Sequence, residues 1–308
     1  MTQLTRINYY NILAMLASAC LAVLIPFELV LLSYAILGPA HYLTEISWLK
    51  GRQFFTLKKY DYLFIIAILI LALAFKLPYA NLLFYTFGLS FLLLFIKANV
   101  NRLIAAILLV VAGYFLLGHN LLRTIFALYM PSLIHVYIFT GAFLLYGALK
   151  SKGISGYLAF FIFLLCPILL CILFTDWHSA PTTWAVNNYK PFISLNTTTL
   201  RNQAINIYTY KGSIILTRVI AFAYTYHYLN WFSKTRVINW HRISLTRAII
   251  IGVIWAASVA LYFFNYRVGF RWLFMLSLLH VVLEFPLNHR SFIGIGREIR
   301  RRLIPIAD

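Results

Sequence analysis

Residues 7–49 of the chain read INYYNILAMLASACLAVLIPFELVLLSYAILGPAHYLTEISWL and contain no lysine or arginine. Pro26 divides this stretch into two apolar runs, at about residues 7–25 and 27–49. A helix needs about 17–25 predominantly apolar residues to cross the ~30 Å hydrocarbon core of a bilayer. Since both runs reach that length, the stretch predicts two consecutive membrane-spanning helices that turn at Pro26.

Further apolar runs follow along the whole chain. The sequence is 63% hydrophobic and only 11% charged, and its mean hydropathy is +0.85. A soluble domain carries about 25% charged residues, so this composition excludes a chain with a largely water-facing surface. We predict an all-α, polytopic integral membrane helix bundle of about ten transmembrane helices, with residues 1–308 forming a single transmembrane domain. The further helices are expected at about residues 62–77, 82–96, 103–118, 124–149, 157–175, 213–232, 248–265 and 272–288.

The basic residues indicate how these helices are oriented. Most of the 26 Lys and Arg residues fall in segments that lie on one side of the membrane, and that side is cytoplasmic if the N-terminus is cytoplasmic. Cytoplasmic loops carry such an excess of basic residues, so we predict that both ends of the chain are cytoplasmic. Anionic lipid headgroups balance the net charge of +19. We therefore expect membrane lipid, and no nucleic acid, as a partner.

One long segment lies outside the predicted helices, at residues 176–212. It begins DWHSAPTTWAVNNYKPFISLN, and Trp and Tyr partition to the membrane interface. We therefore predict an extracytoplasmic loop insertion at the membrane surface. No organelle signal is visible, so the expected location of this multi-pass protein is a bacterial plasma (inner) membrane.

Two pairs of ionisable residues stand inside predicted helices. His41 is followed by Glu45, and His280 is followed by Glu284, each after four residues. Residues at i and i+4 share a helix face about 6 Å apart. Ionisable groups in hydrocarbon are costly and usually functional, so the two pairs are candidates for a site in which Glu45 and Glu284 have catalytic roles.

Depth along the helices groups further histidines with these pairs. At 1.5 Å of rise per residue, His41 and His280 each lie ~12 Å from the cytoplasmic end of their helix, and His227 lies ~8 Å from the end of its own. His135 lies deeper, at ~21 Å, and is expected to cover the cluster from above. Imidazole and carboxylate together are a ligand set for Fe or Zn, and helix bundles hold such sites. The predicted metal ligands are His41, His227, His280 and His135, with Glu45 and Glu284 as ligands or as partners that fix the imidazole tautomers.

Other interpretations of the same residues stay open. A histidine inside a membrane also links helices by hydrogen bonds without binding metal. Tyr224 and Tyr228 lie near His227 on the same helix and are predicted to line an apolar substrate pocket with a few polar tips. An aromatic belt at the membrane interface is the alternative for these rings.

The segment LGPAHYLTEISWL, residues 37–49, resembles the opening motif of the Brp/Blh family, bacteriorhodopsin-related membrane proteins that cleave β-carotene to retinal. The matching positions are Gly38, Pro39, His41 and Glu45. The resemblance implies a polytopic membrane carotenoid oxygenase that holds non-haem iron through intramembrane histidines, with His227 and His280 as further ligands.

These observations lead to two hypotheses of different classes. The first is an integral membrane metalloenzyme, an oxidoreductase of the non-haem iron oxygenase type, that acts on a lipid-soluble substrate such as an isoprenoid or a carotenoid. Its cofactor is a transition metal, and the resemblance favours iron over zinc. The alternative is a proton-coupled membrane transporter or channel that uses the same His and Glu residues. A haem protein that uses two of the histidines is a third possibility.

Overall fold

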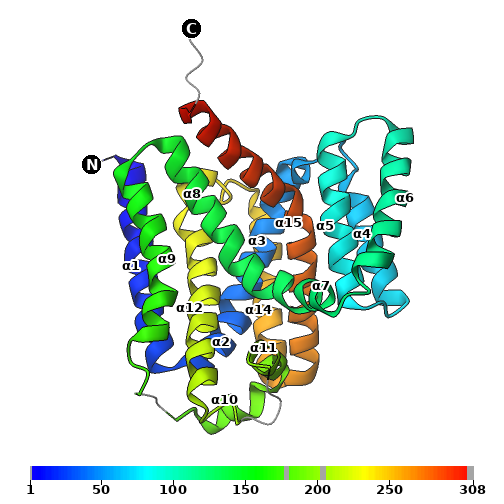
Figure 1. Cartoon of the computed structure of the whole chain (residues 1–308). Coiled ribbons are helices and arrows are strands. Elements are labelled where there is room, and N and C mark those ends of the chain that lie inside the picture. Colours follow the sequence, from blue (N-terminus) through cyan, green and yellow to red (C-terminus); the bar gives the residue numbers. More distant parts are fainter. Residues whose placement is uncertain (1, 177–179, 202–205, 304–308) are drawn as a thin grey trace. The chain divides into compact units, whose positions relative to one another are not determined.

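The computed structural model describes residues 2–176, 180–201 and 206–303 (Figure 1). The chain is 85% helical, and the described residues contain no strand. Within them, seven helical segments are long and apolar enough to cross a membrane, which confirms the predicted all-helical membrane class. They are α1 (Gln3–Leu24), α2–η1–α3 (Pro26–Leu32, Ser33–Leu37 and Gly38–Gly51), α6 (Asn99–Leu116), α7–η3–α8 (Asn120–Thr124, Ile125–Phe139 and Thr140–Ser151), α9 (Ile154–Ile172), α14 (Leu245–Phe264) and α15 (Tyr266–Leu303).

The three other predicted spans fall on helices that are shorter or more polar. Helix α4 (Tyr62–Ala74) has 13 residues and α5 (Tyr79–Phe95) has 17, so they extend over only ~20 Å and ~26 Å. Helix α12 (Lys211–Ser233) has 23 residues and carries both Lys211 and Arg218. The count of ten spans therefore stays a prediction.

The chain forms two compact units. The first consists of Met1–His41 and Phe143–Leu273, and the second of Tyr42–Ala142 and Phe274–Asp308. The boundaries fall within helices α3, α8 and α15. The assignment of residues 1–308 to a single transmembrane domain stays a prediction.

Helix α12 lies at the centre of the first unit, where it packs against α1, α2, η1 and α9 (Figure 1). Every side chain from Ile220 to Tyr228 is buried, as expected of a helix surrounded by others. Its polar groups bond to its neighbours: Tyr226 Oη donates to Asn11 Oδ1 at 3.1 Å, and the hydroxyls of Ser33 and Thr225 are 2.6 Å apart. Polar groups buried between helices have no access to water, so such bonds hold the helices together.

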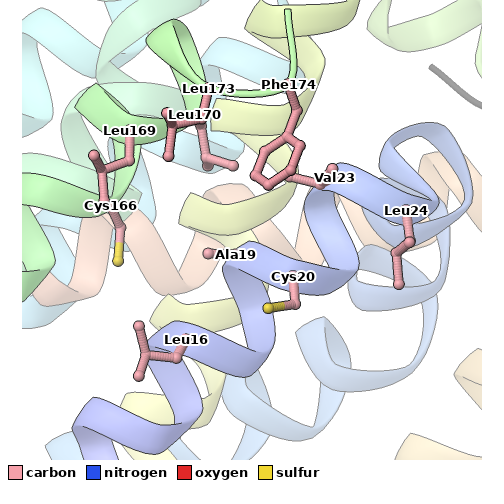
Figure 2. Close-up of a pocket in the computed structure, with 10 residues that line it drawn as sticks. All are labelled: Leu16, Ala19, Cys20, Val23, Leu24, Cys166, Leu169, Leu170, Leu173 and Phe174. Atoms are coloured by element: carbon pink, nitrogen blue, oxygen red, sulfur yellow. The ribbon is translucent and has the colours of Figure 1, made fainter. Parts of the chain in front are cut away.

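An apolar cavity of about 460 Å³ lies between α1 and α9 in the first unit (Figure 2). Two sulfur-bearing side chains, Cys20 and Cys166, line it together with aliphatic side chains and Phe174. None of the predicted site residues contributes to its lining.

The outer segment is more ordered than the predicted surface loop. Its described part, residues 180–201, forms α10 (Thr183–Asn188), η4 (Lys190–Phe192) and α11 (Ile193–Thr199), whereas residues 177–179 and 202–205 lie outside the described residues. Helix α10 contacts α2, and α11 contacts α12. Tyr189 is fully buried between these elements, and burial raises the pKa of its hydroxyl. Helices of six or seven residues are too short for a periodic hydrophobic pattern, so the sequence did not reveal them.

Helix α5 lies at the centre of the second unit and packs against α4, α6 and η3. A buried ion pair ties the segment before α4 to α6. The Arg102 guanidinium donates to the two carboxylate oxygens of Asp61 at 2.7 and 2.9 Å, and Asp61 also accepts the backbone N–H of Lys58 at 2.9 Å. Asp61 is only 2% exposed, so little water competes with these bonds.

Replacing Asp61 with alanine should therefore destabilise the second unit strongly. The Arg102 charge would be left partly buried without its partner, which costs about 3 kcal/mol. Thermal unfolding of the detergent-solubilised protein measures the effect.

The matched control is Asp176→Ala, which removes an exposed ion pair with Lys211 at 2.7 Å. The hydrogen bond from Lys211 lowers the pKa of Asp176, but exposed pairs contribute little to stability because water and salt screen them. A loss of stability in Asp61→Ala that does not exceed the loss in Asp176→Ala would contradict the assigned role of the buried pair.

Candidate metal centre

Two of the helices that carry candidate histidines contain π-helical turns. Segment η1 directly precedes α3, on which His41 lies, and segment η3 contains both Pro131 and His135. A π-helical turn shifts the face on which the following side chains lie, and such turns are frequent at functional sites. A proline within a helix usually produces a kink, because it removes one backbone hydrogen bond. Pro131 lies inside the π-helical segment η3, whose hydrogen-bonding pattern already differs from that of an α-helix.

Three side chains of the second unit converge. His135 Nε2 on η3 lies 3.0 Å from His280 Nε2 and 3.4 Å from Glu284 Oε2, both on α15. One donor atom of each residue lies within 4.8 Å of the others, and each residue is only 1% exposed. Neighbouring ligands on one ion, with bonds of about 2.1 Å, lie about 3.0–3.4 Å apart, and both distances from His135 Nε2 agree with this. The group can therefore hold a transition-metal ion.

The His280 ring is oriented from two sides. Its Nδ1–H donates to the carbonyl oxygen of Ser277 at 2.7 Å, and since a carbonyl only accepts, the proton of the neutral imidazole lies on Nδ1. The lone pair is thus on Nε2, the atom that faces His135. The ring of Tyr42 stacks on the imidazole, with centroids 4.3 Å apart and an interplanar angle of 25°. Metal-binding histidines are commonly oriented by a hydrogen bond at the other ring nitrogen.

The first unit contains a second histidine pair. His41 Nε2 and His227 Nε2 are 3.1 Å apart, and the two rings are nearly perpendicular at 81°. The ring of Tyr228 lies 5.3 Å from that of His41 and 5.4 Å from that of His227, and Trp231 lies 5.5 Å from His41. An imidazole–imidazole hydrogen bond or a shared cation fits this pair, beside the rings of Tyr228 and Trp231.

The structure brings two of the predicted metal ligands, His135 and His280, into direct contact. Depth counted along the helices put His135 well above His280, yet the two Nε2 atoms are in contact. Residue counts measure distance along a helix, and helix tilt or a π-helical segment changes the depth to which that distance corresponds. The predicted set of His41, His227 and His280 includes residues of both units, and it stays a prediction.

The other predicted site residues are buried as well. Glu45 is 2% exposed and interacts electrostatically with Glu284 in the second unit. Of the two tyrosines predicted to line a pocket, Tyr228 contacts the imidazoles directly, and the ring of Tyr224 packs on that of Tyr228 at 6.1 Å. Their role in binding a substrate stays a prediction.

The sequence did not single out Tyr42 or Ser277, although both contact His280. Ser277 precedes His280 by three residues, so the helical repeat was the available signal. Tyr42 comes from α3, and no local pattern connects it to α15. His289, in contrast, has a structural role: its Nε2 lies 3.0 Å from the Phe87 carbonyl oxygen and 2.9 Å from Ser90 Oγ.

Removing the ring that stacks on His280 should weaken metal binding. We expect Tyr42→Ala to lower the affinity of the purified protein for Fe²⁺ or Co²⁺ by about tenfold, the lower end of what loss of an orienting partner costs. Tyr42→Phe keeps the stacked ring and should bind as tightly as the wild type. Competition with a chromophoric chelator measures both affinities, and equal affinities for all three proteins would remove Tyr42 from the site.

Comparison with known proteins does not assign a function to this group of residues. No protein-family model matches the chain, no curated protein is significantly similar to it, and no solved structure matches its fold. The candidate metal centre is therefore assigned from the positions of His135, His280 and Glu284 alone.

Proposed function

We propose that the protein is an integral membrane metalloenzyme whose metal ion is held by His135, His280 and Glu284. The observation that carries this proposal is the convergence of the three side chains within the second unit. Two imidazoles and one carboxylate are the ligand set of non-haem Fe(II) oxygenases, which keep coordination positions open for oxygen and substrate. The same set also binds catalytic zinc, so the preference for iron, and with it for an oxidation, comes from the resemblance of residues 37–49 to the Brp/Blh family.

Each residue has a distinct part in this proposal. His280 offers Nε2 because Ser277 holds its proton on Nδ1, and His135 and Glu284 supply the neighbouring donor atoms. The bound metal would activate O₂ or water. Glu45 lies close enough to Glu284 for the charges of the two carboxylates to repel each other. With a proton on one of them, Glu45 would orient the Glu284 carboxylate or exchange the proton with it. The His41–His227 pair offers a second place for a cation in the first unit.

A lipid-soluble substrate, such as an isoprenoid or carotenoid, suits the surroundings of these residues. The site residues are buried in apolar helices, and aromatic rings lie beside the histidine pair of the first unit. Within the first unit, the apolar cavity between α1 and α9 has the size of a small-molecule pocket. An acyl or isoprenoid chain fits its lining, which includes no residue of the candidate metal centre. The resemblance of residues 37–49 to the Brp/Blh family supports the same substrate class.

We further propose that all ten apolar segments span a bacterial plasma membrane, with both chain ends cytoplasmic. The excess of Lys and Arg in the segments that this topology makes cytoplasmic supports it. Membrane lipid is then the partner of the exposed apolar faces.

Metal analysis of the purified protein tests the proposal. We expect about one equivalent of iron per chain in the wild type, and a loss of at least tenfold in metal affinity in His280→Ala and Glu284→Ala, since each removes a ligand. His241→Ala is the matched control, because His241 is an exposed histidine outside the cluster, and it should keep the full metal content.

Less than about a tenth of an equivalent of any transition metal in the wild type, after expression in metal-supplemented medium, would end the metalloenzyme proposal. Equal metal content in the wild type and all three variants would place the ion elsewhere.

The two buried acids favour a second candidate, a proton-coupled transporter. Glu45 and Glu284 interact electrostatically in the second unit, next to His135. Ionisable residues arranged in this way also form proton relays in transporters.

Proteoliposome assays separate the two candidates. A transporter should show pH-dependent flux that Glu45→Gln abolishes and that metal chelators leave unchanged. The metalloenzyme should show no such flux, while its metal content should depend on His280 and Glu284. Chelator-insensitive flux in protein free of metal would reverse the preference stated above.

A further inference from the structure

Asn288 extends the polar face of α15 beyond the candidate metal centre. It lies one helical turn after Glu284 and two turns after His280, and residues spaced by four lie along one side of a helix. Asn288 is only 1% exposed. Across residues 2–176, 180–201 and 206–303, no group forms a hydrogen bond with its Oδ1 or its Nδ2.

This distinguishes Asn288 from the other buried asparagines of the described chain, Asn11, Asn196 and Asn230, which all form hydrogen bonds. Asn11 Oδ1 accepts from Tyr226 and from Ser233, and Asn196 Nδ2 donates to Ser213 and Thr217. Buried amides are nearly always paired, because an unpaired one loses its bonds to water without replacement. Asn288 therefore indicates a bound group that satisfies it.

The chemistry of the carboxamide limits what that group is. A cation would satisfy only the acceptor Oδ1, and a carbonyl or carboxylate would satisfy only the donor Nδ2–H. A hydroxyl both donates and accepts, so it satisfies both ends of Asn288. Glu284 Oε2 also forms no hydrogen bond within the described part of the chain. An alcohol has one proton, which it donates either to Asn288 Oδ1 or to this Glu284 oxygen while it accepts from Asn288 Nδ2, whereas a water molecule can donate to both.

We propose that Asn288 and Glu284 form a hydroxyl-binding subsite next to the metal centre. Helical side chains lean toward the N-terminus of their helix, and Glu284 lies one turn N-terminal to Asn288 on α15. The hydroxyl belongs either to the alcohol end of an otherwise apolar substrate or to a water molecule held at the same place. The subsite rests on the proposed function because Glu284 belongs to both. Where the hydroxyl belongs to the substrate, the subsite narrows the substrate class to lipid-soluble alcohols.

Binding of a simple alcohol to metal-free protein in lipid nanodiscs tests the substrate arm. We expect 1-dodecanol to raise the melting temperature of the wild type by about 3 °C, while dodecane, which lacks the hydroxyl, has no effect. Asn288→Leu should abolish the shift. Ser291→Ala should keep it, because Ser291 is a buried neighbour on α15 whose hydroxyl already donates to the Leu287 carbonyl.

The absorption spectrum of the Co²⁺-loaded protein tests the water arm. A spectrum that changes in Asn288→Leu and stays unchanged in Ser291→Ala, without an effect of dodecanol, assigns the hydroxyl to water. No effect of Asn288→Leu in either assay overturns the subsite. Where Asn288→Leu does not fold or is strongly destabilised without ligand, Asn288→Ala replaces it in both assays, with the same outcomes.

The two proposals fail in different ways. A wild type that binds no metal but responds to dodecanol through Asn288 refutes the metalloenzyme and keeps the subsite. If the wild type binds metal through His280 and Glu284 and Asn288→Leu has no effect in either assay, the metalloenzyme proposal stands and the subsite is refuted.

Discussion

The exclusion of water from the bilayer core is the constraint on which the rest of this structure depends. Backbone N–H and C=O groups there must bond within the chain, and for separate segments only helices achieve that. The same constraint acts on side chains. The pairs Tyr226–Asn11 and Ser33–Thr225 join α12 to its neighbours, and each group supplies what water would supply elsewhere.

The histidines follow from the same constraint. In each unit two imidazoles from helices far apart in sequence turn their Nε2 atoms toward each other, at 3.1 Å for His41 and His227 and at 3.0 Å for His135 and His280. The rings are nearly perpendicular in both pairs, at 81° and 83°. A buried imidazole needs a hydrogen-bond or metal partner because it has lost its bonds to water. A second imidazole, a carboxylate or a metal ion can each be that partner. The carboxylate beside the second pair makes that pair the stronger candidate for a metal centre.

Only a few polar side chains surround the candidate metal centre. Ser277 and Tyr42 orient His280, and Glu45 interacts with Glu284. Asn288 continues the face by one turn, with its hydrogen-bonding capacity unused in the described chain. Such an arrangement, a few polar groups in an apolar surrounding, is typical of sites that bind a largely apolar molecule and position one end of it.

The sequence by itself determined the class of the protein, since hydropathy is a property of consecutive residues and a span of about twenty apolar residues has few alternatives to a membrane helix. It also singled out the pairs His41–Glu45 and His280–Glu284 as candidates, because a spacing of four places side chains on one face of any helix. It did not find the contact of His135 with His280, the stacking of Tyr42 or the short helices of the outer segment. Only the tertiary structure decided these, because helix rotation, tilt and the π-helical turns of η1 and η3 set which faces meet, and these depend on packing between segments that no local pattern connects.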